Sequence, residues 1–175
     1  MFPVNDYKFY MRRVTQDSEG NDIFGTITDI EEYFPGLRYK AITGMEAYGK
    51  PYTYSEAFSD SDKTAVYVPS DACNEPTTIK LTLYFFDKNE HSDLPSAITA
   101  IDAQYHAFVE FILGARILYW DDVRQRKALL YVTDKIEPTT DRVSDNFYRE
   151  VTITFTNVYG RTFGMSQMTE ELPTG

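Results

Sequence analysis

The segment from Leu94 to Leu113 most constrains the fold, because it is the one strong amphipathic helix pattern in a chain dominated by alternation. Apolar residues recur in it at helical spacing and form a continuous stripe. Asp93 is a suitable N-cap, Pro95 suits a first helical turn, and Gly114 ends the pattern. The pattern predicts a helix at about 94–113 that packs on a sheet through Ile98, Ile101, Tyr105, Phe108 and Ile112.

Alternation of apolar and polar residues, the pattern of a half-buried strand, occupies most of the remaining chain. In the clearest case Val151, Ile153 and Phe155 point to one side and the threonines between them to the other. One helix inserted late among antiparallel strands predicts an α+β fold, an antiparallel β-sandwich or partly open β-barrel flanked by the helix. The predicted strands are 7–12, 37–43, 64–68, 79–86, 116–120, 128–136 and 147–158, with a charged loop at 121–127.

The length of 175 residues suits one domain. We expect an N-terminal arm, or a strand plus a loop, at residues 1–36. The sandwich or barrel core with its helix is expected at 37–163, and a mobile polar tail at 164–175. The single cysteine, Cys73, excludes an intrachain disulfide and favours a reducing compartment.

Residues 45–63 have no clear period and are rich in aromatic side chains. A long segment of this kind is uncommon inside a compact domain and is often functional. Aromatic rings also favour interfaces, because they provide large contact area with few rotatable bonds. Two interpretations stay open, a hairpin packed on its own domain or an arm docking on a neighbouring subunit through Tyr48, Tyr52, Tyr54 and Phe58.

A strip of small residues lies roughly opposite the apolar stripe of the predicted helix and ends in a phenylalanine. One interpretation is that this ring is a surface aromatic covered by a loop of its own chain. The other is that the strip packs against another subunit. The strip consists of Ala100, Ala103, Ala107 and Phe111.

The sequence offers no recognisable catalytic, metal or cofactor site. The histidines, His91 and His106, lie in a polar turn and on a polar helix face, and no nucleophile elbow or Gly-rich phosphate loop is present. The acidic pairs at 60–62 and 121–122 lack the offsets of a calcium loop. A net charge of −10 argues against sequence-specific nucleic-acid binding. No apolar run is long enough to span a bilayer, so we expect no membrane partner.

A second function class also fits an aromatic-rich sandwich. Exposed rings can stack against sugars, and Tyr52, Tyr54 and Trp120 are the candidates for such ligand stacking. In this alternative the chain is a carbohydrate- or protein-binding module. Paired carboxylates for sugar hydrolysis carry little information, because 27 acidic residues offer many possible pairs.

The order of elements resembles the folded core shared by phage tail-tube and distal-tail proteins, with tail-completion proteins as close relatives. The features that carry the resemblance are Gly36-Leu37-Arg38-Tyr39 leading into the segment 45–63, the helix end at 111–114, and the closing strand 151–155 followed by Gly160. Together these cover roughly residues 37–163. Secretion-tube proteins of bacteria share the same general architecture.

The resemblance implies a non-enzymatic structural role with no catalytic residues or cofactors. Proteins of this kind form rings, usually hexamers, around a channel through which DNA passes. The implied partners are further copies of the chain and other tail or head–tail joining proteins, in a virion tail assembled in the host cytoplasm. An acidic balance would keep DNA from adhering to the channel, threonine-rich strand faces could line it, and the long segment and the alanine strip would meet neighbouring subunits.

Overall fold

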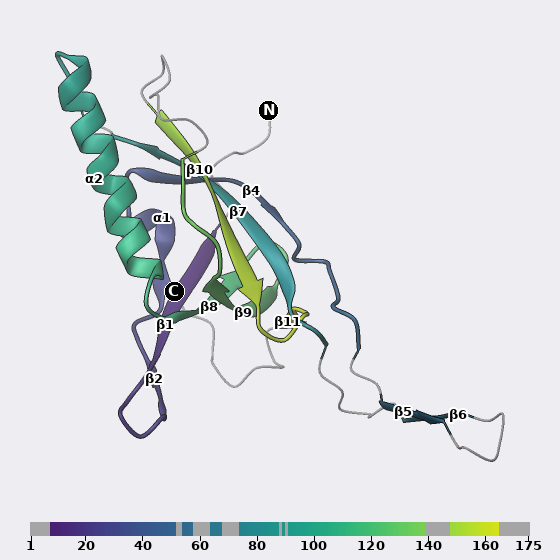
Figure 1. Cartoon of the computed structure of the whole chain (residues 1–175). Helices are drawn as coiled ribbons and strands as arrows, with labels where there is room; N and C mark the ends of the chain where they lie inside the picture. Colours follow the sequence, from purple (N-terminus) through teal and green to yellow (C-terminus); the bar gives the residue numbers. More distant parts are fainter. Residues whose placement is uncertain are drawn as a thin grey trace.

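The computed structural model of the chain describes residues 8–51, 54–57, 64–67, 74–87, 89, 91–138 and 148–164. The described residues contain eleven strands and two helices, whose arrangement is shown in Figure 1. The strands are β1 (Phe9–Gln16), β2 (Asp22–Phe24), β3 (Thr28–Asp29), β4 (Leu37–Thr43), β5 (Tyr54–Ala57), β6 (Thr64–Tyr67), β7 (Thr77–Phe86), β8 (Arg116–Asp121), β9 (Arg126–Val132), β10 (Tyr148–Asn157) and β11 (Phe163–Gly164). The helices are α1 (Ile30–Tyr33) and α2 (Leu94–Ile112).

Nine strands form one sheet in the order β2-β1-β8-β9-β10-β7-β4, with β3 paired to β1 and β11 paired to β9. All of these pairings are antiparallel. The longest is between β7 and β10, where the register runs from Tyr148 opposite Phe86 to Asn157 opposite Thr77. Strict alternation along both strands explains this pairing, because it turns an apolar row from each strand toward the same core. The buried row comprises Ile79, Leu81, Leu83, Phe85, Val151, Ile153 and Phe155.

Helix α2 begins and ends as the sequence predicts. The Ser96 N–H donates a 2.8 Å hydrogen bond to the Asp93 carboxylate, which caps the first turn. At the other end Gly114 takes a left-handed conformation with φ of 75°. The helix flanks the sheet (Figure 1) and its buried face packs into the main core; that face comprises Ala97, Ile101, Tyr105, Phe108 and Ile112.

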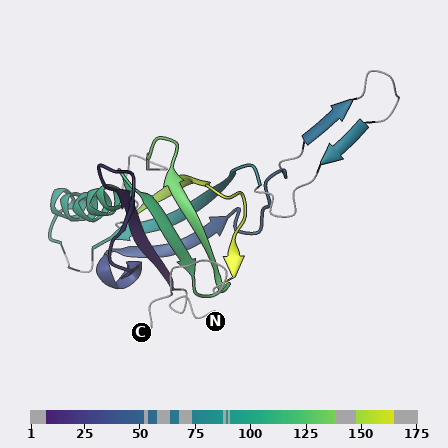
Figure 2. The same cartoon turned by 90° about the horizontal axis from the view of Figure 1, so that it is seen from below.

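The short helix α1 closes the curled sheet. It contacts β1 and β3 near one end of the sheet and β4 at the other end (Figure 2). Ile30 and Phe34 are buried there, and the Glu31 carboxylate accepts a 2.9 Å hydrogen bond from the N–H of Tyr39 on the edge strand β4. The molecule is therefore an α+β fold with a mostly antiparallel, partly open barrel and one main helix on its flank, as expected.

Of the two forms expected within residues 1–36, the described part contains a strand, since β1 pairs with β8 inside the main sheet and buries Phe9 and Met11 completely. One expectation from the sequence needs correction. The charged loop expected at 121–127 is shorter, because Asp121 ends β8 and Arg126 begins β9. Asp121 and Lys127 are fully buried. Alternation of apolar residues cannot locate strand ends that are made of charged side chains.

A smaller apolar cluster lies apart from the main core. Val14, Leu118, Trp120 and Leu129 are buried in it. Along β8, Leu118 and Trp120 of this cluster alternate with Ile117 and Tyr119, which belong to the main core. Since neighbouring strand residues point to opposite faces, the sheet at β1, β8 and β9 is apolar on both sides.

Candidate functional site

Strands β5 and β6 form a hairpin that pairs with no other described strand. Tyr54 lies opposite Tyr67 and Ala57 opposite Thr64, in a sheet of its own. The hairpin projects from one side of the main sheet in both views (Figures 1 and 2). We call residues 52–73 the arm. Of the two interpretations of the segment 45–63, the structure has a hairpin, and it stands away from the sheet rather than on it.

The two chain segments at the base of the arm are tied to each other and to the main sheet. The Glu75 N–H donates to the Lys50 carbonyl at 2.8 Å, and Pro51 and Asn74 form a bridge. The Asn74 side-chain amide donates to the Gly49 carbonyl at 2.7 Å. The Gly49 N–H in turn donates to the Gly160 carbonyl at 2.7 Å. We call this set of contacts the arm base, and it fixes where the arm leaves the body.

Glycine is required at two positions of the arm base. A Cβ atom on Gly49 would lie 1.7 Å from the carbonyl oxygen of Glu75, and one on Gly160 would lie 2.0 Å from the same oxygen. Gly160 also has a φ of 65°, which side chains rarely adopt. The three backbone segments therefore approach more closely than any other residue type allows.

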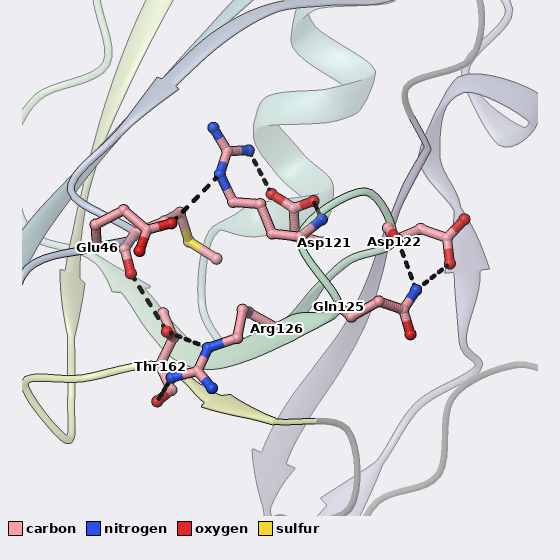
Figure 3. A network of polar contacts seen from close by, with 8 residues as sticks. Glu46, Asp121, Asp122, Gln125, Arg126 and Thr162 are labelled. Carbon is pink, nitrogen blue, oxygen red and sulfur yellow. Dashed lines mark hydrogen bonds and ion pairs between the residues drawn. The ribbon is translucent and has the colours of Figure 1, made fainter.

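A polar network joins the chain that leads into the arm to the turn between β8 and β9 (Figure 3). Arg124 donates to the buried carboxylate of Asp121 through its backbone N–H at 2.9 Å and its guanidinium at 2.7 Å. Arg124 Nε also lies 3.9 Å from a carboxylate oxygen of Glu46 (Figure 3). These contacts stabilise the turn and hold it against the chain that leads into the arm.

A second branch of the network runs through Thr162. Arg126 donates to the Thr162 hydroxyl at 3.0 Å and to the Thr162 carbonyl at 2.8 Å (Figure 3). The Thr162 hydroxyl donates to the Met45 carbonyl at 3.3 Å. One buried threonine thus links three parts of the chain. They are strand β9, the residues just before β11, and Met45 at the start of the segment 45–63.

The aromatic residues predicted for the arm interface differ in how much of each the structure describes. Tyr48 is 64% exposed, and the Arg161 guanidinium carbon lies 5.6 Å from the centroid of its ring. The backbone of Tyr54 lies in β5. Tyr52 and Phe58 lie outside the described residues.

The alanine strip of α2 is divided between surface and core. Ala103 and Ala107 are exposed, while Ala100 and Phe111 are half-buried. The ring of Phe111 meets that of Phe34 edge-on at 5.5 Å and lies 6.3 Å from that of Tyr33. Phe111 is thus partly covered by its own chain, and Ala103 and Ala107 keep an open surface.

Trp120 does not have the exposure that ligand stacking requires. Its side chain is 0% exposed and belongs to the smaller apolar cluster. Trp120 lies on β8, where every residue from Ile117 to Asp121 is buried. The backbone of Tyr54 lies in a separate sheet. Trp120 is therefore a core residue and not a stacking surface. Tyr52 and the side chain of Tyr54 lie outside the described residues, so stacking by these two rings stays a prediction.

The described residues contain no group of three or more His, Cys, Asp or Glu side chains placed to hold a metal ion. His91 contacts the Asp87 carboxylate at 2.5 Å in the turn before α2, four residues away along the chain. Burial raises the pKa of Tyr105, whose hydroxyl donates to the Ile136 carbonyl at 3.5 Å. None of the described helices is both long and apolar enough to cross a bilayer.

Sequence reasoning missed that Gly160 belongs to the arm base and that Arg161, next to it, contacts the ring of Tyr48. Both lie between β10 and β11, where the chain makes an excursion and then returns to pair with β9. A glycine after a strongly alternating strand signals a turn, but it does not say which distant backbone the turn will touch.

Solved structures of phage proteins resemble this chain at low sequence identity. No protein-family model matches the sequence, and no curated protein matches it. The Dit protein of phage SPP1, described as a paradigm of the hub adsorption apparatus of phages that infect Gram-positive bacteria, matches with 11% identity and a TM-score of 0.43, over 89% of this chain and 52% of that one. A chain of the phage p2 baseplate in its activated conformation matches with 13% identity and a TM-score of 0.48, over 97% of this chain and 55% of that one. This chain thus spans about half the length of each of these two chains.

Proposed function

We propose that the chain is a non-enzymatic structural component of a phage or phage-like tail that forms rings, expected to be hexamers, around a channel for DNA. The observation that carries the proposal is the arm. A two-stranded hairpin is at best marginally stable alone in water, yet here it stands apart from the sheet and is tied at its base by backbone hydrogen bonds. A neighbouring subunit is the natural support for such an element.

Two further features fit assembly. The exposed side chains of Ala103 and Ala107 allow close approach of a neighbour to α2. The net charge of −10 disfavours adhesion of DNA to a channel wall. We propose that the subunit interface includes the alanine strip with Phe111 and the aromatic residues Tyr48, Tyr52, Tyr54 and Phe58. Other tail or head–tail joining proteins would flank the ring in the virion, after assembly in the host cytoplasm.

The test is the native mass of the protein over a wide concentration range, with negative-stain imaging of the largest species. Closed rings, or stacks of rings, are the expected result. A chain that stays monomeric at every concentration would contradict self-assembly. If such a monomer also bound oligosaccharides, the binding-module function would replace the structural one.

A further inference from the structure

We propose that Arg161 and the aromatic rings around it receive the acidic tip of the arm of a second copy of the chain. This inference rests on the proposed self-assembly and names the contact that the arm makes. The receiving surface consists of Tyr48, Tyr159, Arg161 and Phe163, and we call it the Arg161 surface.

Arg161 is exceptional among the described arginines. Its guanidinium makes no hydrogen bond or ion pair with the part of the chain that the structure describes, and its Nε atom is buried without a partner. Every other described arginine is engaged. Arg12, Arg13 and Arg38 donate to carbonyl oxygens, Arg116, Arg124 and Arg149 pair with carboxylates, and Arg126 donates to Thr162.

Aromatic rings hold the Arg161 guanidinium in place. Its central carbon lies 5.6 Å from the centroid of Tyr48 and 5.1 Å from that of Phe163. Tyr159 meets Phe163 edge-on at 5.6 Å. Contacts to ring faces orient the planar group. The Nε atom is buried, but the two terminal Nη groups are not among the buried unpaired atoms, and this end of a guanidinium can bind a carboxylate with two parallel hydrogen bonds.

The Arg161 surface also has the composition of a protein-binding surface. Tyr48 is 64% exposed and Tyr159 is 40% exposed. Tyrosine and arginine are the residue types enriched where binding energy concentrates in interfaces. The backbone next to Arg161 is fixed by the contacts of Gly160 with Gly49 and Glu75, so the surface is in place before a partner arrives.

The arm supplies the complementary chemistry. Its sequence carries four acidic residues, Glu56, Asp60, Asp62 and Asp71, against the single lysine Lys63. Two of the acids stand in the run Ser59-Asp60-Ser61-Asp62, directly after Phe58 and between the sequences of β5 and β6. This run therefore offers carboxylates beside an aromatic ring to an arginine held between aromatic rings.

The direction of the arm makes the contact intermolecular. Strand β5 runs away from the main sheet and β6 runs back toward it (Figures 1 and 2). Strand β5 thus ends, and β6 begins, on the side of the hairpin away from the main sheet, whereas Arg161 lies between β10 and β11 of that sheet. A contact between the arm of one copy and the base of the next is head-to-tail, which is the kind of interface that closes into rings or continues as stacks.

A charge exchange tests the inference. We expect Arg161→Glu to raise the protein concentration required for assembly at least tenfold. The double variant Asp60→Arg, Asp62→Arg should raise it by a similar factor. The chain that carries all three substitutions should regain assembly. Lys50→Glu is the matched control, because it makes the same charge change on an exposed side chain, and Lys50 contributes only its backbone carbonyl to the arm base. Sedimentation velocity over a concentration series measures assembly, and a urea midpoint within error of the wild type verifies folding of each variant.

Each outcome decides something different. If the wild type forms rings and Arg161→Glu forms them equally well, the Arg161 contact is wrong and the proposed function stands. If Arg161→Glu disrupts rings but the triple variant does not restore them, the acidic tip is not the occupant. If Lys50→Glu disrupts rings equally, general charge rather than Arg161 governs assembly. A wild type that is monomeric at all concentrations overturns the inference together with the proposed function.

Discussion

The backbone N–H of Gly49 donates a 2.7 Å hydrogen bond to the carbonyl oxygen of Gly160, a residue more than one hundred positions away in the chain. This bond joins the chain entering the arm to the turn that follows β10. Because Glu75 pairs with Lys50 beside it, the chain leaving the arm is held at the same place. The direction of the arm is therefore set by the main sheet rather than by the hairpin itself.

We predict that Gly160→Ala destabilises the fold much more than Gly20→Ala. Both glycines have positive φ, 65° and 84° respectively. Only at Gly160 would the new methyl group meet backbone, 2.0 Å from the Glu75 carbonyl oxygen, since Gly20 has nothing within 4 Å. Gly20→Ala should cost about 1–2 kcal/mol for the backbone conformation alone, and Gly160→Ala roughly 1–3 kcal/mol more through overpacking. Urea unfolding of both variants measures the difference, and equal losses would contradict the close approach.

We predict that Ala103→Arg prevents assembly without destabilising the monomer. Ala103 is exposed on α2 and arginine is a good helix former, so the free energy of unfolding should change by less than about 0.5 kcal/mol. The large charged side chain would block a neighbour that packs on the strip. His106→Arg is the control, since His106 is exposed on the polar face of the same helix. Native mass spectrometry of both variants decides the matter, and ring formation by Ala103→Arg would exclude the strip from the interface.

We predict that Trp120 fluorescence is insensitive to sugars. Trp120 is the single tryptophan of the chain and its side chain is fully buried, so its emission reports one apolar site. The emission should be blue-shifted relative to free tryptophan, weakly quenched by acrylamide, and unchanged on addition of oligosaccharides. Quenching should become strong only in denaturant. An oligosaccharide-dependent change in emission from the folded protein would revive the ligand-stacking role.

We predict that the stabilising effect of Asp93 disappears in acid. Hydrogen bonds from the Ser96 side chain and the Ser96 backbone N–H lower the pKa of the Asp93 carboxyl below its ordinary value. A group with a lowered pKa in the folded state stabilises the fold above its unfolded pKa, about 3.9, and that contribution is lost as the pH falls through the folded value. The variant Asp93→Asn should therefore be less stable than the wild type near pH 6 and should equal it in strong acid. Urea midpoints across this pH range test the prediction, and a constant difference would contradict it.

The strands and the main helix could be predicted because their burial is periodic. Ile79 to Phe85 and Val151 to Phe155 alternate without interruption, and the helix stripe is bounded by a capping aspartate and a glycine. Strands β2, β3 and β11 and helix α1, each four residues or shorter, were not predicted, although β6, which is also four residues long, was. Elements of that length are formed by their tertiary contacts, so local pattern carries little information about them.

The candidate site was only partly predictable for the same reason. The aromatic composition of the segment 45–63 indicated an unusual element, and it is a hairpin with its own pairing. The partners of its base, Gly160 and Glu75, come from distant parts of the chain, and no local signal links them. Trp120 was misinterpreted because a large aromatic residue at a strand end can point either to solvent or to a second apolar cluster.

The closure of the sheet by α1 gives the barrel a seam. Elsewhere neighbouring strands are held by a ladder of backbone hydrogen bonds, but across this gap the ends of the sheet meet through Ile30, Phe34 and the Glu31 carboxylate on the Tyr39 N–H. Side-chain contacts of this kind yield before a ladder does, so amide hydrogens of α1 should exchange with solvent sooner than those of β7 and β10. If the sheet opens at α1 while the β7–β10 pairing stays intact, the curvature of the barrel can change without loss of its longest strand pairing. In the proposed ring, such a change would let each copy adapt to its neighbours.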